Sequence, residues 1–197
     1  MSILMSSDVT GFFDEAVGSA FAARKVEASR GAQAYLVGLL VDFAVRGPAT
    51  NTLQRPVTFL LHEALQAPAP ERFEKLKGLG DSSLYVSGLF QDHLEARGVD
   101  VSYVSSVGAT AYNSAAGLLQ KGDGPRGLNL FGELATKFGS LVEALHEVAD
   151  AIFAAGSNNP ESLLKLYDRW RKTGSETLTR EMAARGFVPM KPCGGLQ

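Results

Sequence analysis

Apolar residues recur at intervals of three and four along most of this chain, which is the spacing that places them on one face of an α-helix. The longest run is an a/d seam over three heptads, formed by Phe131, Leu134, Phe138, Leu141, Leu145, Val148 and Ile152. No segment shows the sustained alternation of apolar and polar residues that is typical of a half-buried strand. The pattern therefore predicts an all-α fold.

Helix boundaries follow from capping residues, prolines and glycines. They predict a single-domain helical bundle of about seven to nine helices over 1–189, followed by a flexible tail over 190–197. Helices are expected at 8–23, 32–45, 56–67, 81–96, 100–120, 128–153, 160–172 and 175–185, with a further turn at 71–77. Segment 32–45 is apolar on almost every side, so we expect it to lie at the centre of the fold together with the seam of 128–153.

Composition and charge narrow the function classes. The 197 residues are 45% hydrophobic, and the single cysteine, Cys193, excludes a disulfide framework. A formal net charge of -2 gives no overall attraction to nucleic acid or to an anionic membrane. The chain opens without a secretory signal pattern, and its longest apolar stretch is shorter than a bilayer span. We therefore expect a cytoplasmic protein that does not bind membranes.

One motif has metal-ligand spacing. Glu143 and His146 form a Glu-x-x-His pair, which places a carboxylate and an imidazole on adjoining positions of a helix and occurs twice in the di-iron sites of helical bundles. Here it occurs once, because His62 and His93 each have a phenylalanine three residues before them. The heptad positions of Glu143 and His146 face away from the apolar seam, so they form a metal site only if another helix covers them.

The segment 84–119 is rich in glycine, alanine and serine. Close helix packing is the simpler interpretation, because small residues let helix axes approach one another. The alternative is a ligand crevice walled by these small residues and floored by Tyr85, Tyr103 and Tyr112, whose rings present apolar faces with a polar tip. These three tyrosines are the candidate cofactor-binding residues, and the sequence does not identify a cofactor.

Charge is distributed unevenly along the chain. From residue 160 onward there are seven basic and four acidic residues, a net of +3, which leaves -5 for the remainder. The candidate partner-binding residues in this part are Arg169, Arg171, Lys172, Arg180 and Arg185. Two helices joined by a short turn near Gly174 also permit a helix-turn-helix interpretation. Docking onto a protein partner is the simpler hypothesis, because acidic residues would face the phosphates on the second helix.

Three segments carry a resemblance. They are Leu79–Phe90 (LGDSSLYVSGLF), Val99–Tyr112 (VDVSYVSSVGATAY) and Leu166–Ser175 (LYDRWRKTGS). Together they resemble an uncharacterised family of bacterial all-helical hypothetical proteins of about this length. The resemblance implies a bacterial, cytoplasmic protein, and it transfers no activity and no site residues.

No phosphate-binding loop, nucleophile elbow or other catalytic signature occurs in the sequence. Our leading hypothesis is a non-enzymatic regulatory or protein-interaction module that acts by docking onto a protein partner. The sequence is also compatible with a homodimer that forms through the long seam. The alternative hypothesis is a helical bundle that binds a small molecule or a metal, and oxidoreductase activity is one function of such a bundle. Nucleic-acid binding through the basic C-terminal helices ranks third.

Overall fold

The computed structural model describes the backbone of residues 2–46, 55–120, 129–156 and 160–190, and the side chains of 9–45, 55–120, 129–156 and 163–190. Within these ranges the chain forms helices and turns, with no strand, which confirms the all-α prediction. Ten helices are present there, one more than the upper expectation: α1 (Ser2–Arg24), α2 (Arg30–Arg46), α3 (Val57–Gln66), α4 (Ala69–Leu89), α5 (Gln91–Ala96), α6 (Val101–Gln120), α7 (Leu130–Thr136), α8 (Phe138–Ala155), α9 (Pro160–Thr173) and α10 (Glu176–Ala184). Of the tail predicted over 190–197, residues 191–197 lie outside the described residues.

Several of the expected boundaries are wrong. Helix α1 begins at Ser2 and not at residue 8, and the helix expected over 81–96 is divided at Phe90, whose φ of -124° and ψ of 34° separate α4 from α5. The chain does not break at 78–80, because α4 continues through this segment to Leu89. The helix expected over 128–153 is divided at Lys137, whose φ of -97° and ψ of 11° leave the helical region. The apolar seam nevertheless runs through the break, since Leu134 and Phe138 on its two sides are both buried.

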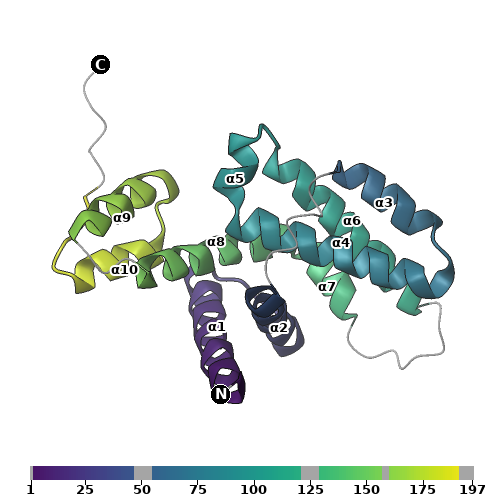
Figure 1. Cartoon of the computed structure of the whole chain (residues 1–197), viewed down its shortest axis with the longest axis horizontal. Coiled ribbons are helices and arrows are strands. Elements are labelled where there is room, and N and C mark those ends of the chain that lie inside the picture. The colour runs from purple at the N-terminus through teal and green to yellow at the C-terminus, as the bar shows by residue number, and fades with distance from the viewer. Residues whose placement is uncertain (1, 47–54, 121–128, 157–159, 191–197) are drawn as a thin grey trace.

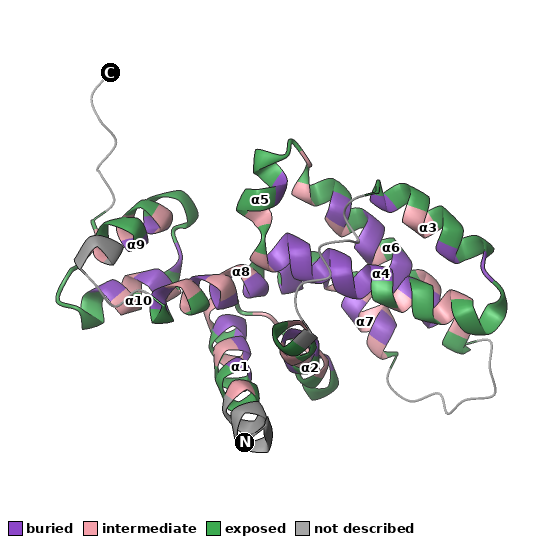
Figure 2. Ribbon diagram, viewed as in Figure 1, coloured by how far each residue is buried: buried purple, intermediate pink, exposed green. Residues whose placement is uncertain are grey.

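The helices are arranged around α8, which extends from one end of the molecule toward the other (Figure 1). Helices α3 to α7 are grouped at one end, α9 and α10 lie at the opposite end, and α1 and α2 project side by side (Figure 1). The largest apolar cluster joins residues of α1, α2 and α4 to α8, and a smaller one joins the end of α8 to α9 and α10. Buried residues are dense along α4 and α8 (Figure 2). In the described part of the chain, no helix is long and apolar enough to cross a membrane.

Helix α2 departs from its expected central position. Leu36 and Leu40 are buried, but Ala34 and Gly38 are exposed and Val45 keeps 73% of its surface accessible. The helix packs against α1 on one side and against α4 and α7 on another, and no described residue covers its third side. An apolar sequence all around a helix predicted burial on every side, and this part of the prediction is wrong.

A carboxylate on α7 fixes the start of α2. The Oε1 atom of Glu133 accepts a hydrogen bond from the backbone N–H of Ser29 at 2.8 Å, and Oε2 accepts one from the Ser29 hydroxyl at 2.6 Å. Lys137 lies 3.0 Å from the same carboxylate. The hydrogen bonds from Ser29 and the charge of Lys137 lower the pKa of Glu133 to about 2. This contact sets the position from which α2 extends.

Candidate functional site

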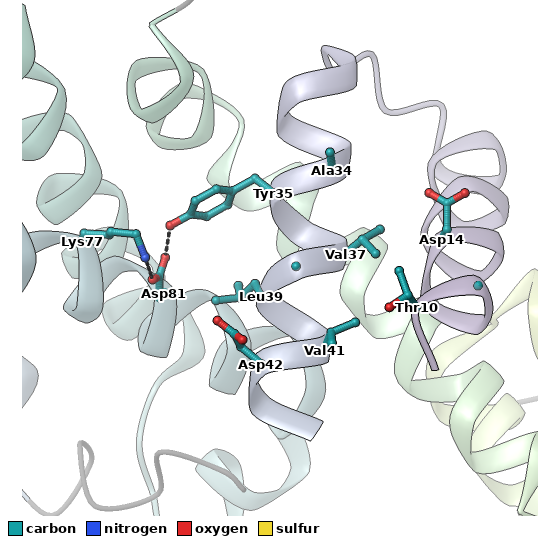
Figure 3. A pocket seen from close by; sticks show the side chains of 12 residues that line it. Thr10, Asp14, Ala34, Tyr35, Val37, Leu39, Val41, Asp42, Lys77 and Asp81 are labelled. Atoms are coloured by element: carbon teal, nitrogen blue, oxygen red, sulfur yellow. Dashed lines mark hydrogen bonds and ion pairs between the residues drawn. The ribbon is translucent and has the colours of Figure 1, made fainter. Parts of the chain in front are cut away.

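A groove of about 800 Å³ crosses α2 between α1 and α4. Helix α2 supplies most of the lining (Figure 3). The residues that line the groove are Thr10, Gly11 and Asp14 of α1, Ala34, Tyr35, Val37, Gly38, Leu39, Val41 and Asp42 of α2, and Lys77 and Asp81 of α4.

The middle of the groove is open and has small residues on its floor. Gly11, Ala34 and Gly38 are exposed, and a methyl group placed on either glycine would have no atom within 4 Å. Thr10, Asp14 and the other outward-facing residues make this an open surface feature and not an enclosed cavity. Another chain could therefore approach the backbones of α1 and α2 closely.

The α4 wall is built around the buried carboxylate of Asp81, which is 7% exposed. Its Oδ1 atom accepts hydrogen bonds from the hydroxyls of Tyr35 at 2.6 Å and Tyr112 at 2.7 Å. Its Oδ2 atom accepts one from Lys77 Nζ at 2.7 Å. Figure 3 shows Tyr35 reaching from α2 toward Asp81 and Lys77, on the other side of α2 from Thr10 and Asp14. The carboxylate thus ties α2 and α6 to α4 and fixes one wall of the groove.

This network predicts a loss of stability in alkali. Burial, followed by the negative charge of Asp81, raises the pKa of Tyr35 and of Tyr112 above the usual 10.0. A raised pKa in the folded state favours the protonated tyrosine, so its contribution to stability is full below pH 10.0 and declines as the pH rises above it. Urea unfolding at pH values from about 8 to about 11 measures this effect. The free energy of unfolding should fall more steeply with pH for the wild type than for a Tyr35→Phe/Tyr112→Phe variant. Equal slopes for the two proteins would contradict this assignment.

The groove also has an acidic lining. Asp81 is paired with Lys77, so the formal charge of the lining comes from Asp14 on α1 and Asp42 on α2. The remaining lining side chains are mostly aliphatic. An apolar surface with an acidic margin complements an amphipathic segment whose charged residues are basic.

Four of the residues singled out in the sequence meet in a second, polar cleft of about 540 Å³ between α5, α8 and α9. Glu143 and His146 of α8 line it together with Arg169 and Lys172 of α9. The Nε2 atom of His146 lies 3.0 Å from the carbonyl oxygen of Ser87. Because a carbonyl only accepts, Nε2 carries the proton in this contact, which leaves Nδ1 as an acceptor when the ring is neutral.

Two buried carboxylates at this cleft were not predicted from the sequence, Asp150 in its lining and Glu147 nearby on α8. Glu147 and Asp150 are each 1% exposed. Arg24 donates to Glu147 from Nε at 2.9 Å, and the Ser175 hydroxyl donates to the same carboxylate at 2.7 Å. Arg169 donates from Nε to Asp150. Burial opposes the ionisation of Glu147, but the hydrogen bonds from Ser175 and α10 and the charge of Arg24 outweigh it and lower its pKa. The two carboxylates fasten α1, α9 and α10 to α8.

Within the part of the chain that the structure describes, no three histidine, cysteine, aspartate or glutamate side chains are grouped so that they could hold a metal ion. Glu143 and His146 therefore have no third ligand among the described residues. The metal-binding interpretation gains no support from their surroundings.

The three candidate tyrosines lie in separate surroundings. Tyr112 is fully buried and bonded to Asp81, whereas the ring of Tyr85 stacks on Phe43 with 4.1 Å between ring centroids. Tyr103 is exposed on another side of the bundle, where its hydroxyl donates to Thr58 at 3.1 Å. The small residues of 84–119 serve close packing at Gly88 and Gly108, where an added methyl group would collide with the side chains of α8.

The five candidate partner-binding residues in the region of α9 and α10 divide into two groups. Arg169 is held by Asp150, and Arg185 donates to the carbonyl oxygen of Ala154 at 2.9 Å, so both contribute to packing. The other three, Arg171, Lys172 and Arg180, are exposed. They form no ion pair with any described residue. These three remain available to a partner.

Comparison with known proteins gives no relative: no protein-family model, no curated protein and no solved structure matches this chain. The resemblance based on three segments therefore stays a prediction. In the structure these segments form the packed pair α4 and α6 and the part of α9 that contacts Asp150. The described residues form an all-helical protein, and the comparisons recognise no family for it.

Proposed function

We propose that this protein is a helical interaction module that receives a basic amphipathic helix of a protein partner in the groove across α1, α2 and α4. The observation that carries the proposal is the open groove itself, whose floor contains two helix-interior glycines with empty space in front of them. Docking an amphipathic helix into an apolar groove is a recurrent mode of protein recognition.

The two glycines make the groove accessible to a partner. At Gly11 and Gly38 no atom of a neighbouring element lies within 4 Å of an added methyl group. Gly78 and Gly139 have the same open space outside the groove, so the glycines permit the close approach of a partner backbone and do not require it. A larger side chain at Gly11 or Gly38 would hold the partner away.

The shape and charge of the surface favour a helix over a small molecule. The exposed side of α2 runs from Ala34 to Val45, which corresponds to about 16 Å of helix at 1.5 Å per residue. Outward-facing residues make up much of the lining, whereas a small-molecule site encloses most of its ligand. The exposed carboxylate of Asp14 on α1 favours basic residues on the partner.

Fluorescence anisotropy with model peptides tests this function. The probe is a labelled amphipathic helix of leucine and lysine of about 18 residues, and the comparison peptide replaces each lysine with glutamate. We expect the leucine–lysine peptide to bind and the leucine–glutamate peptide to bind at least about tenfold more weakly. Replacing Gly38 by leucine should weaken binding by about tenfold or more, because the side chain fills the floor of the groove.

Gly139→Leu is the matched control, since Gly139 is also exposed on a helix with open space before it and does not line the groove. Equal peptide affinity in the Gly38→Leu and Gly139→Leu proteins would refute the proposal. Sedimentation velocity distinguishes a partner helix from a second copy of this chain as the molecule bound in the groove. If the wild type were a dimer and only the Gly38→Leu protein were a monomer, the groove would bind a second copy of this chain and not a basic partner helix.

A further inference from the structure

A separate pocket of about 310 Å³ lies between α3, α5 and α6. It is lined by Arg55, Pro56, Val57, His93, Leu94, Arg97, Val99, Tyr103 and Val104. Its volume is at the lower end of the range for small-molecule sites, so it suits a ligand of modest size. The groove proposed for a partner helix shares none of these residues.

The interior of this pocket is apolar. Val57, Leu94 and Val104 are almost completely buried and come from three different helices. Tyr103 adds an aromatic wall, and the hydrogen bond from its hydroxyl to Thr58 on α3 holds the ring in place. An apolar group that entered the pocket would be removed from water on several sides, which favours binding in proportion to the area covered.

The rim of the pocket is basic. Arg55, His93 and Arg97 line it, and no aspartate or glutamate does. The charge of Arg55 is already compensated, because its guanidinium contacts Glu63 at 2.5 and 3.1 Å. Arg97 is exposed and forms no ion pair with a described residue, so it is the cation available to a ligand.

We infer that this pocket binds a small apolar carboxylate, with its hydrocarbon part against Leu94 and Val104 and its carboxylate on the guanidinium of Arg97. An apolar interior with a few convergent polar groups is the usual composition of a ligand site. A guanidinium pairs with a carboxylate through two parallel hydrogen bonds, which gives both strength and orientation. Straight-chain and aromatic carboxylates share this chemistry.

Isothermal titration calorimetry with octanoate and phenylacetate tests the inference, and octanamide and phenylacetamide are the neutral counterparts. At least one carboxylate should bind with a dissociation constant of about 1 mM or below, and about tenfold more tightly than its amide. The carboxylate that binds more tightly shows whether the pocket prefers a straight-chain or an aromatic ligand. Absence of binding by both carboxylates, or equal affinity for acid and amide, overturns the inference.

Two variants locate the ligand. Arg97→Met should weaken carboxylate binding about tenfold and leave the affinity for the amide unchanged, because only the charge contact is lost. Val99→Phe should reduce the affinity for both, since the larger side chain occupies the pocket. Arg180→Met is the control, because Arg180 is an exposed arginine on α10, outside the pocket. Carboxylate binding that is equal in the Arg97→Met and Arg180→Met proteins would also overturn the inference.

Discussion

Replacing Glu147 by alanine should lower the free energy of unfolding by about 3 kcal/mol, the lower end of the range measured when one partner of a buried ion pair is removed, because Glu147 is buried but the Arg24 side chain is 33% exposed. The carboxylate accepts from Arg24, from the Ser175 hydroxyl and from the backbone N–H of Thr177 at 3.3 Å. Its removal leaves these donors without their acceptor and detaches α1 and the start of α10 from α8. Urea unfolding followed by circular dichroism measures the loss.

The same helix supplies the control. Glu143 precedes Glu147 by one turn but is exposed, so Glu143→Ala should change the free energy of unfolding by less than about 0.5 kcal/mol. The lowered pKa of Glu147 adds a pH signature, because the stability it supplies is present above the usual value of 4.5 and is lost as the pH falls through the lowered pKa. The difference in the free energy of unfolding between the wild type and the Glu147→Gln protein should therefore decrease in acid. Similar losses from Glu147→Ala and Glu143→Ala would refute this role.

Two glycines of α4 should respond to the same substitution with opposite signs. A methyl group at Gly80 would come within 2.5 Å of the ring of Tyr112. That ring cannot withdraw easily, because it is fully buried and its hydroxyl is bonded to Asp81. We expect Gly80→Ala to destabilise the protein by about 2 kcal/mol, as overpacking of a core does.

Gly78→Ala should stabilise the protein by about 1 kcal/mol, because nothing lies within 4 Å of an added methyl group and alanine is the better helix former. For a chain of this size the two changes correspond to a fall in Tm of about 4–8 °C and a rise of about 2–4 °C. Thermal unfolding of both variants beside the wild type measures them. A stabilising Gly80→Ala would show that α4 and α6 do not approach as closely as described.

The sequence predicted the apolar core well, because core burial follows the period of the helix. Leu134, Leu141 and Leu145 of the a/d seam are completely buried, as that pattern requires. The same pattern favours exposure of Glu147 and Asp150, because their heptad positions face away from the seam. They are buried because α1, α9 and α10 cover that side of α8, and a single helix period contains no information about distant helices that pack on it.

Predictions from glycines and from the apolar pattern of one helix were wrong where packing between helices determines the structure. Gly78 and Gly80 predicted an interruption, but α4 continues because at Gly80 the missing side chain admits the ring of Tyr112. The groove was not predicted either. Most of its lining belongs to α2, and the apolar pattern of 32–45 cannot distinguish a helix surrounded by neighbours from one with an exposed side.

Amide chemical-shift mapping tests the central claim, that the groove across α1, α2 and α4 receives a basic amphipathic helix. In a titration of the ¹⁵N-labelled protein with the leucine–lysine peptide, the largest shifts should occur at Gly11, Ala34, Gly38 and Asp42, which line the groove. They should be absent with the leucine–glutamate peptide. Shifts concentrated on α9 and α10, or no shifts at saturating peptide, would contradict the proposed function.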